Sequence, residues 1–288
     1  MRNFLRYKLC ELFGIPLYLD VSLIFLLLFF LISGGGVHEG IVCAALLLFS
    51  IAAHELGHAL TARAFGYPTR DITLSLLGGC ASLVALPRKA WQEFLTAFAG
   101  PAVSFLLAAS GALCISFVAV EGGFLDALGF VVSEALESFR IKVDLRGDLY
   151  FKPDDFVLVN MLFYLSVMNM MLGIFNLLPG FPMDGGRIFR SALTFFAGRV
   201  KATYYAMIVG RGFAILLGLA GIWRMMNGLS WGFVTVLIAW MIWKEGYREY
   251  QLARLESGWD FADYRARASA PPYGGSGSES EVTRSERE

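Results

Sequence analysis

Long apolar runs are the sequence feature that most restricts how this chain can fold. Several stretches are dominated by Leu, Ile, Val, Phe and Ala, and a helix needs roughly 20 such residues to cross a bilayer. Hydrophobic residues make up 57% of the 288 positions, whereas a soluble domain has about 45–50% even with glycine counted. We therefore expect an all-α polytopic membrane protein with about six transmembrane helices, at roughly 15–33, 41–65, 93–120, 155–178, 203–226 and 229–246.

The positions of Lys and Arg predict how the chain is oriented. Both ends of the apolar region and the connections after the second and fourth runs carry several Lys or Arg residues, whereas the connection SGGGVHEG after the first run carries none. Positive charge is enriched on the cytoplasmic side, so we expect both termini in the cytoplasm and the protein in the cell (inner) membrane. The formal net charge is zero, so no basic surface indicates nucleic-acid binding.

Residues 66–92 interrupt the series of apolar helices. Two short β-like runs, Thr73–Leu77 and Ala81–Leu86, flank Gly78-Gly79, and this pattern is a hairpin signal. Strands at membrane depth are tolerated only where protein or a wet cavity covers them. We expect a re-entrant β-hairpin between helices 2 and 3 on the cytoplasmic side, with a surface hairpin among the lipid headgroups as the alternative.

The C-terminal segment differs in composition from the rest of the chain. From Ala268 onward it reads ASAPPYGGSGSESEVTRSERE, and a segment this rich in Pro, Gly, Ser and charge cannot bury a core. We expect one membrane domain over 1–250 and a cytoplasmic tail over 251–288 that is disordered from about 268. The four cysteines are far apart and form no CxxC pair, which predicts neither a disulfide framework nor a cysteine zinc site.

The stretch HELGH at 54–58 places ionisable groups inside the second apolar run. On a helix, His54 and His58 face the same side and can bind one metal ion, while Glu55 can reach a water beside it. HExxH on a helix is typical of zinc metalloproteases. The motif fixes only three positions and also occurs by chance, but ionisable residues in membrane spans are rare and usually functional. The sequence therefore predicts a metal site.

A third ligand is needed, because a catalytic zinc has three protein ligands and one open position. The candidate is Asp184, in the stretch NLLPGFPMDGG. Pro179 and Pro182 break the fourth apolar run, and the two glycines after Asp184 allow a close backbone approach. The carboxylate can therefore turn back toward HELGH. The alternative is that Asp184 caps a helix that begins at Gly185.

These motifs together resemble the site-2 protease family of intramembrane zinc metalloproteases, peptidase M50. HELGH matches the HExxH of that family, and NLLPGFPMDGG matches its NxxPxxPxDG motif at every named position. Three further segments resemble the family's opening, its glycine-pair hairpin and its AGPxxN segment, namely GIPLYLDVS (14–22), LSLLGGCASL (74–83) and AGPAVSFLL (99–107). The resemblance covers about residues 1–250. Ser104 departs from it, because the family often has Asn at this position.

The resemblance also implies a role for each matching residue. It assigns one Zn²⁺ to three ligands, His54, His58 and Asp184, and the role of general base to Glu55. Asn176 would lie beside the site and hold the substrate or the developing oxyanion, with a helix–helix hydrogen bond as the alternative. Gly78 and Gly79 in the hairpin would contact the substrate.

The function that the resemblance implies is intramembrane proteolysis. Such an enzyme hydrolyses peptide bonds in or near the transmembrane segments of single-span membrane proteins, and an unwound substrate could pair with an exposed strand edge of the hairpin. The alternatives are an inactive membrane scaffold of the same fold and a metal transporter. The intact HExxH and Asp184 argue against the scaffold. A transporter has no evident need for Glu55 beside His54, and no inverted repeat is visible in the sequence.

Overall fold

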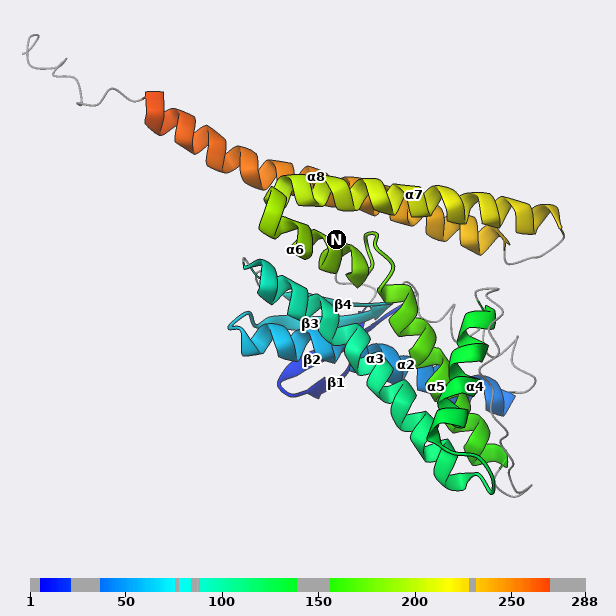
Figure 1. The fold of residues 1–288 in the computed structure, drawn as a ribbon. Coiled ribbons are helices and arrows are strands. Elements are labelled where there is room, and N and C mark those ends of the chain that lie inside the picture. The colour runs from blue at the N-terminus through cyan, green and yellow to red at the C-terminus, as the bar shows by residue number, and fades with distance from the viewer. Residues whose placement is uncertain are drawn as a thin grey trace, which may run out of the picture.

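The computed structural model describes residues 6–21, 37–75, 78–83, 87, 89–138, 156–227 and 232–269. Most of these residues are helical, and the strands among them form one four-stranded sheet in the order β1-β2-β3-β4. Figure 1 shows the sheet beside a group of crossing helices, with the pair α7 and α8 along one side of the molecule.

Four helices in the described part of the chain are long and apolar enough to cross a membrane. They are α2 (Val37–Ala64), α3 (Ala90–Val118), α5 (Phe156–Asn176) and α7 (Arg199–Met226), and they match the second to fifth expected spans. The sixth expected span falls in α8 (Gly232–Ser269), which is not among the four, because charged residues begin at Lys244 and recur in the next turns. A total of six spans therefore stays a prediction.

The first expected span was wrong in its opening residues. Ile15–Asp20 form strand β2, which pairs antiparallel with β1 (Arg6–Leu12), and 22–33 lie outside the described residues. The strand follows from alternation, because Ile15 and Leu17 are buried while Pro16 between them is more exposed, and a period of two is typical of a strand. The high hydrophobicity of the whole run 15–33 conceals this alternation in the sequence.

The hairpin expected after the second span is present, but Gly78 and Gly79 are strand residues in it. β3 (Thr69–Ser75) pairs antiparallel with β4 (Gly78–Leu83) and parallel with β2. Gly78 and Gly79 lie within β4, opposite Ser75 and Leu74, and 76–77 lie outside the described residues. The depth of this hairpin in a membrane stays a prediction.

The sheet packs against α2 through an apolar cluster. On the sheet side, Ile72 and Leu74 of β3 join Ile15 and Leu17 of β2, and on the helix side Ile51 and Ala59 contact them. Burial of this face fixes the register of the sheet, because a slip by one residue would turn the apolar set away from α2. The sheet is thereby anchored to the helix that carries HELGH.

A second cluster holds α3, α4 (Phe124–Ser138) and α5 together. None of the six expected spans covers α4. Its signal was the spacing of Ala127, Val131 and Ala135, all buried, since residues four apart share one helix face. This cluster positions α3 beside α4 and α5.

The remaining elements lie on the other side of α3. α6 (Asp184–Ala197) contacts both α3 and α7, and α7 and α8 run side by side (Figure 1). Met183, Ala214 and Ile242 form the apolar contact between these helices and the segment before α6. α8 continues through the expected domain boundary at 250 to Ser269, and 270–288 lie outside the described residues, so the expected domain limits stay a prediction.

Candidate metal centre

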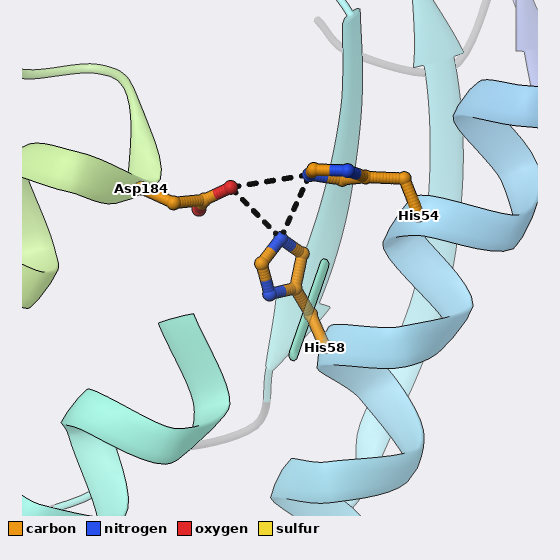
Figure 2. Close-up of side chains that lie close together, drawn as sticks. All are labelled: His54, His58 and Asp184. Carbon is orange, nitrogen blue, oxygen red and sulfur yellow. Dashed lines mark hydrogen bonds and ion pairs between the residues drawn. The ribbon is translucent and has the colours of Figure 1, made fainter. Parts of the chain in front are cut away.

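Three side chains predicted as ligands converge on one point. His54 Nε2 and His58 Nε2 lie 3.1 Å apart, and each lies 3.1 Å from Asp184 Oδ2. Figure 2 shows both imidazoles extending from α2 toward the carboxylate at the start of α6. All three residues are buried, and they form a group that could hold a metal ion.

The local structure around Asp184 explains how a residue far along the chain reaches α2. α5 ends at Asn176, before the two prolines, and the chain folds back so tightly that a Cβ on Gly185 would lie 2.3 Å from the carbonyl oxygens of Leu177 and Leu178. Asp184 is the first residue of α6, and Met183 occupies the cap position without a side-chain bond. The alternative of Asp184 as a helix cap is therefore not what the structure shows, because its carboxylate contacts the histidines.

Helix α3 orients both imidazoles from the opposite side. His58 Nδ1 lies 2.7 Å from the carbonyl oxygen of Thr96, and His54 Nδ1 lies 2.9 Å from Ser104 Oγ. A carbonyl only accepts, so His58 Nδ1 donates its hydrogen and Nε2 of the neutral ring carries a free lone pair. Such hydrogen bonds fix the tautomer and ring orientation of metal-binding histidines.

This donor set fits a divalent metal ion. Without a cation, the lone pairs of two imidazoles and a carboxylate would face one another in a buried space, which is unfavourable. Tetrahedral zinc with ligands about 2.0–2.1 Å away places neighbouring ligand atoms roughly 3.3 Å apart, close to the observed 3.1 Å.

Gly100 of α3 keeps space open at the convergence point. A Cβ at this position would lie 2.2 Å from His58 Nε2 and 2.6 Å from His54 Nε2. Gly57, inside HELGH, allows the close contact of the two helices, because a Cβ there would lie 2.9 Å from the carbonyl oxygen of Ala99. Glycine is thus required at both positions, because the imidazoles lie close to the backbone of α3 at Gly100 and α3 lies close to the backbone of α2 at Gly57.

The other expected site residues are Glu55, Asn176, Gly78 and Gly79, and none of them belongs to the group of converging ligand atoms. Glu55 is buried on α2 next to His54. Asn176 is the last residue of α5, and its Nδ2 donates to the carbonyl of Leu172 in the same helix, which differs from the alternative of a bond between helices. Gly78 and Gly79 lie in β4, the outermost strand on its side of the described sheet. The roles of these residues stay predictions.

Comparison with known proteins shows the family. The model of peptidase family M50 matches residues 42–219, a range that includes all three converging side chains. The chain belongs to peptidase family M50.

Relatives support the assignment to M50. A candidate zinc metalloprotease of Synechocystis sp. is 34% identical over 251 residues, covering 81% of this chain and 56% of the relative. A zinc metalloprotease of Methanocaldococcus jannaschii is 29% identical over 254 residues, covering 87% of this chain and 62% of the relative. This M50 chain thus spans little more than half the length of these relatives.

A solved structure shares the fold of this M50 chain. The site-2 protease from Methanocaldococcus jannaschii superposes with a TM-score of 0.56 at 26% sequence identity, covering 85% of this chain and 95% of that chain. With four apolar helices of spanning length in its described part, this M50 chain is an integral membrane protein.

Several residues of the site were not expected from sequence. Ser104 had been noted only as a departure from the family pattern, and the carbonyl of Thr96 and the missing side chain of Gly100 carried no separate signal. All three belong to one buried face of α3. Their spacing of four residues marks a shared helix face, but only the packing of α3 on α2 shows that this face meets the metal centre.

Proposed function

We propose that this chain is an intramembrane zinc metalloendopeptidase that hydrolyses peptide bonds in or near the transmembrane segments of single-span membrane proteins. The observation that carries the proposal is the convergence of His54, His58 and Asp184 beside Glu55. Family membership and the zinc metalloprotease names of the relatives support it. In cells this activity would serve regulated intramembrane proteolysis, in which cleavage releases a membrane-tethered protein.

The metal would be held by His54, His58 and Asp184. When bound, zinc supplies Lewis-acid chemistry: it polarises a carbonyl and lowers the pKa of water. The hydrogen bonds that both Nδ1 atoms make with α3 would orient the two imidazoles toward the metal. Glu55 accepts the proton of the attacking water and later donates it to the leaving amine.

Substrate binding is proposed for the outer edge of β4. A substrate helix satisfies its own backbone groups and must unwind before attack, which leaves N–H and C=O groups without partners in an apolar surrounding. The strand order supports this edge, because β3 is paired on both sides whereas β4 is paired on one. An extended peptide beside Gly78 and Gly79 would regain backbone hydrogen bonds by strand addition. Asn176 would contact the same peptide.

The decisive experiment separates metal binding from cleavage. The full chain is purified in detergent as wild type, Asp184→Ala and Glu55→Gln, and metal content is measured. We expect about one zinc per chain in the wild type and in Glu55→Gln, and loss of zinc in Asp184→Ala, since three protein ligands hold catalytic zinc.

Cleavage is tested in membranes of cells that express wild type or Glu55→Gln. New protein termini are mapped by mass spectrometry. We expect termini within or beside single transmembrane segments only with the wild type. A wild type that binds zinc but yields the same termini as Glu55→Gln would contradict the protease and favour the inactive scaffold.

A further inference from the structure

A buried cluster of charged residues lies beside the metal centre and outside the residues assigned to it. Arg190 of α6 is 2% exposed, and its Nε donates to Glu93 Oε1 of α3 at 2.9 Å. Its Nη2 also contacts Glu93, and its Nη1 donates to Glu249 Oε2 of α8 at 2.8 Å. Arg199, the first residue of α7, donates to Glu93 Oε2 at 3.2 Å. The cluster joins four helices.

The first connection runs from Arg190 to Asp184. Both residues belong to α6, so the position of one along the helix axis sets the position of the other. The guanidinium carbon of Arg190 also lies 5.0 Å from the ring centre of Phe181, a residue that is 1% exposed and begins the turn leading into α6. A Cβ on Gly186 would lie 2.8 Å from the nitrogen of Phe181. Arg190 therefore covers the fold-back that delivers Asp184.

The second connection runs from Glu93 to the histidines. Glu93, Thr96 and Gly100 follow one another at spacings of three and four residues and are all buried, so they share one face of α3. That face presents the carbonyl acceptor for His58 and the gap beside both Nε2 atoms. The salt bridge between Arg190 and Glu93 thus ties the helix that carries the carboxylate ligand to the helix that orients the imidazole ligands.

The third connection brings in α8. Glu249 supplies the second carboxylate to Arg190. Burial lowers the pKa of Arg190, but Glu93 and Glu249 outweigh it and raise that pKa, so the guanidinium remains charged. The planar guanidinium of an arginine can donate hydrogen bonds to two carboxylates in fixed directions, whereas the ammonium of a lysine cannot.

A purely stabilising role explains this cluster poorly. Desolvation of buried charges offsets much of their attraction, and well-packed apolar residues of similar volume often serve stability equally well. Buried ionic groups are better suited to fixing one relative arrangement of elements. Here that arrangement includes α3 and α6, which together define the metal centre.

We infer that Arg190 is a positioning residue. Through its salt bridge to Glu93, Arg190 holds the carboxylate of Asp184 in position relative to the imidazole of His58. Through Glu249, this arrangement also depends on the position of α8. The inference rests on the metal site proposed above and deepens it. α8 supplies none of the three converging ligands. It contacts the segment that carries Asp184 through Ile242, which packs against Met183, and it contacts α6 through Glu249, the contact that the inference concerns. A displacement of α8 would weaken metal binding.

The test uses the detergent-purified full chain and two metal probes, zinc and cobalt. Zinc affinity is measured by competition with a chelator, and the visible absorption of cobalt reports the coordination geometry. Arg190→Lys keeps the charge but loses the fork, and we expect about a tenfold or greater loss of zinc affinity with an altered cobalt spectrum. Glu249→Gln keeps size and hydrogen bonding, and we expect a smaller loss in the same direction.

The matched control is Glu245→Gln, one turn earlier on α8, whose carboxylate pairs with Arg248 at the surface. Thermal unfolding of the metal-free protein separates positioning from stability. We expect Glu249→Gln to unfold at the temperature of the control while binding zinc more weakly. If Arg190→Lys fails to fold, the zinc affinity of Glu249→Gln relative to Glu245→Gln tests the inference.

Two results would overturn the inference. One is zinc affinity and cobalt spectra in Glu249→Gln that equal those of Glu245→Gln. The other is a loss of zinc affinity in Glu249→Gln that is accompanied by a lower unfolding temperature than that of the control, because a general loss of stability would then explain the weaker binding. A wild type that binds no zinc would instead overturn the proposed function, and this inference with it.

Discussion

Gly100 makes a direct prediction at the scale of single residues. Its absent side chain leaves the space beside both Nε2 atoms, and a Cβ would lie within 2.6 Å of each. We expect Gly100→Ala to reduce zinc affinity at least about a hundredfold, because the imidazoles must move apart and the ligand distances no longer suit the metal. Gly212→Ala on α7 is the control, since a Cβ there meets nothing within 4 Å. Equal zinc content in the two variants would contradict the assigned geometry.

Ser104 gives a second prediction at this scale. It is fully buried and lies 2.9 Å from His54 Nδ1. Ser104→Ala would leave this ring nitrogen without its partner, and we expect zinc affinity to fall about tenfold, the lower end of the range for such outer partners. Ser110→Ala on the same helix removes an exposed hydroxyl bonded to Leu106 and should change nothing. Chelator competition measures both, and an unchanged Ser104→Ala would show that His54 needs no such partner.

The ligands could be predicted from sequence to different degrees. His54 and His58 follow from local geometry, because any helix places residues four apart on one face. Asp184 required the resemblance to a family, since spacing alone left it open as a helix cap. Thr96 and Ser104 could not be predicted, because their contribution depends on how α3 packs against α2 rather than on their own local sequence.

At the scale of elements, β4 offers a test of substrate binding. In an antiparallel pair, alternate residues direct their N–H groups toward the partner strand or away from it. Proline substitutions along 79–83 should therefore alternate in effect: those at outward amides should lower cleavage about five- to tenfold, consistent with the loss of one backbone hydrogen bond, while unfolding temperature stays unchanged. The rate is measured on a substrate identified by terminus mapping. Uniform effects along the strand would contradict strand addition.

The sequence predicted best the elements that consist of a long run of apolar residues. α2, α3, α5 and α7 were expected because about 20 apolar residues suffice to indicate a span. β2 was missed because its six residues merge with the apolar run that follows, so length concealed alternation. Gly78 and Gly79 are strand residues opposite Ser75 and Leu74, although a glycine pair is a common turn signal.

At the scale of the whole molecule, the remaining prediction is orientation. α3 has 29 residues, about 43 Å at 1.5 Å per residue, which exceeds the roughly 30 Å hydrocarbon thickness. Thr96, whose carbonyl orients His58, lies near the Ala90 end of this helix. We therefore predict that the metal centre lies in the half of the membrane that faces the side of Ala90, and the Lys and Arg distribution predicts that this side is the cytoplasm.

Thiol labelling tests this orientation directly. One variant keeps exposed Cys10 of β1 as its only cysteine, and another replaces all four cysteines and carries Glu121→Cys, an exposed position beyond the other end of α3. With a membrane-impermeant maleimide on intact cells, we expect labelling at 121 only, and labelling of Cys10 once the membrane is opened. The reverse pattern would place the metal centre near the outer surface, and its substrates would then be cut on the outer side. Labelling at both positions in intact cells would instead show that residues 6–121 do not cross the membrane an odd number of times, and the count of spans would need revision.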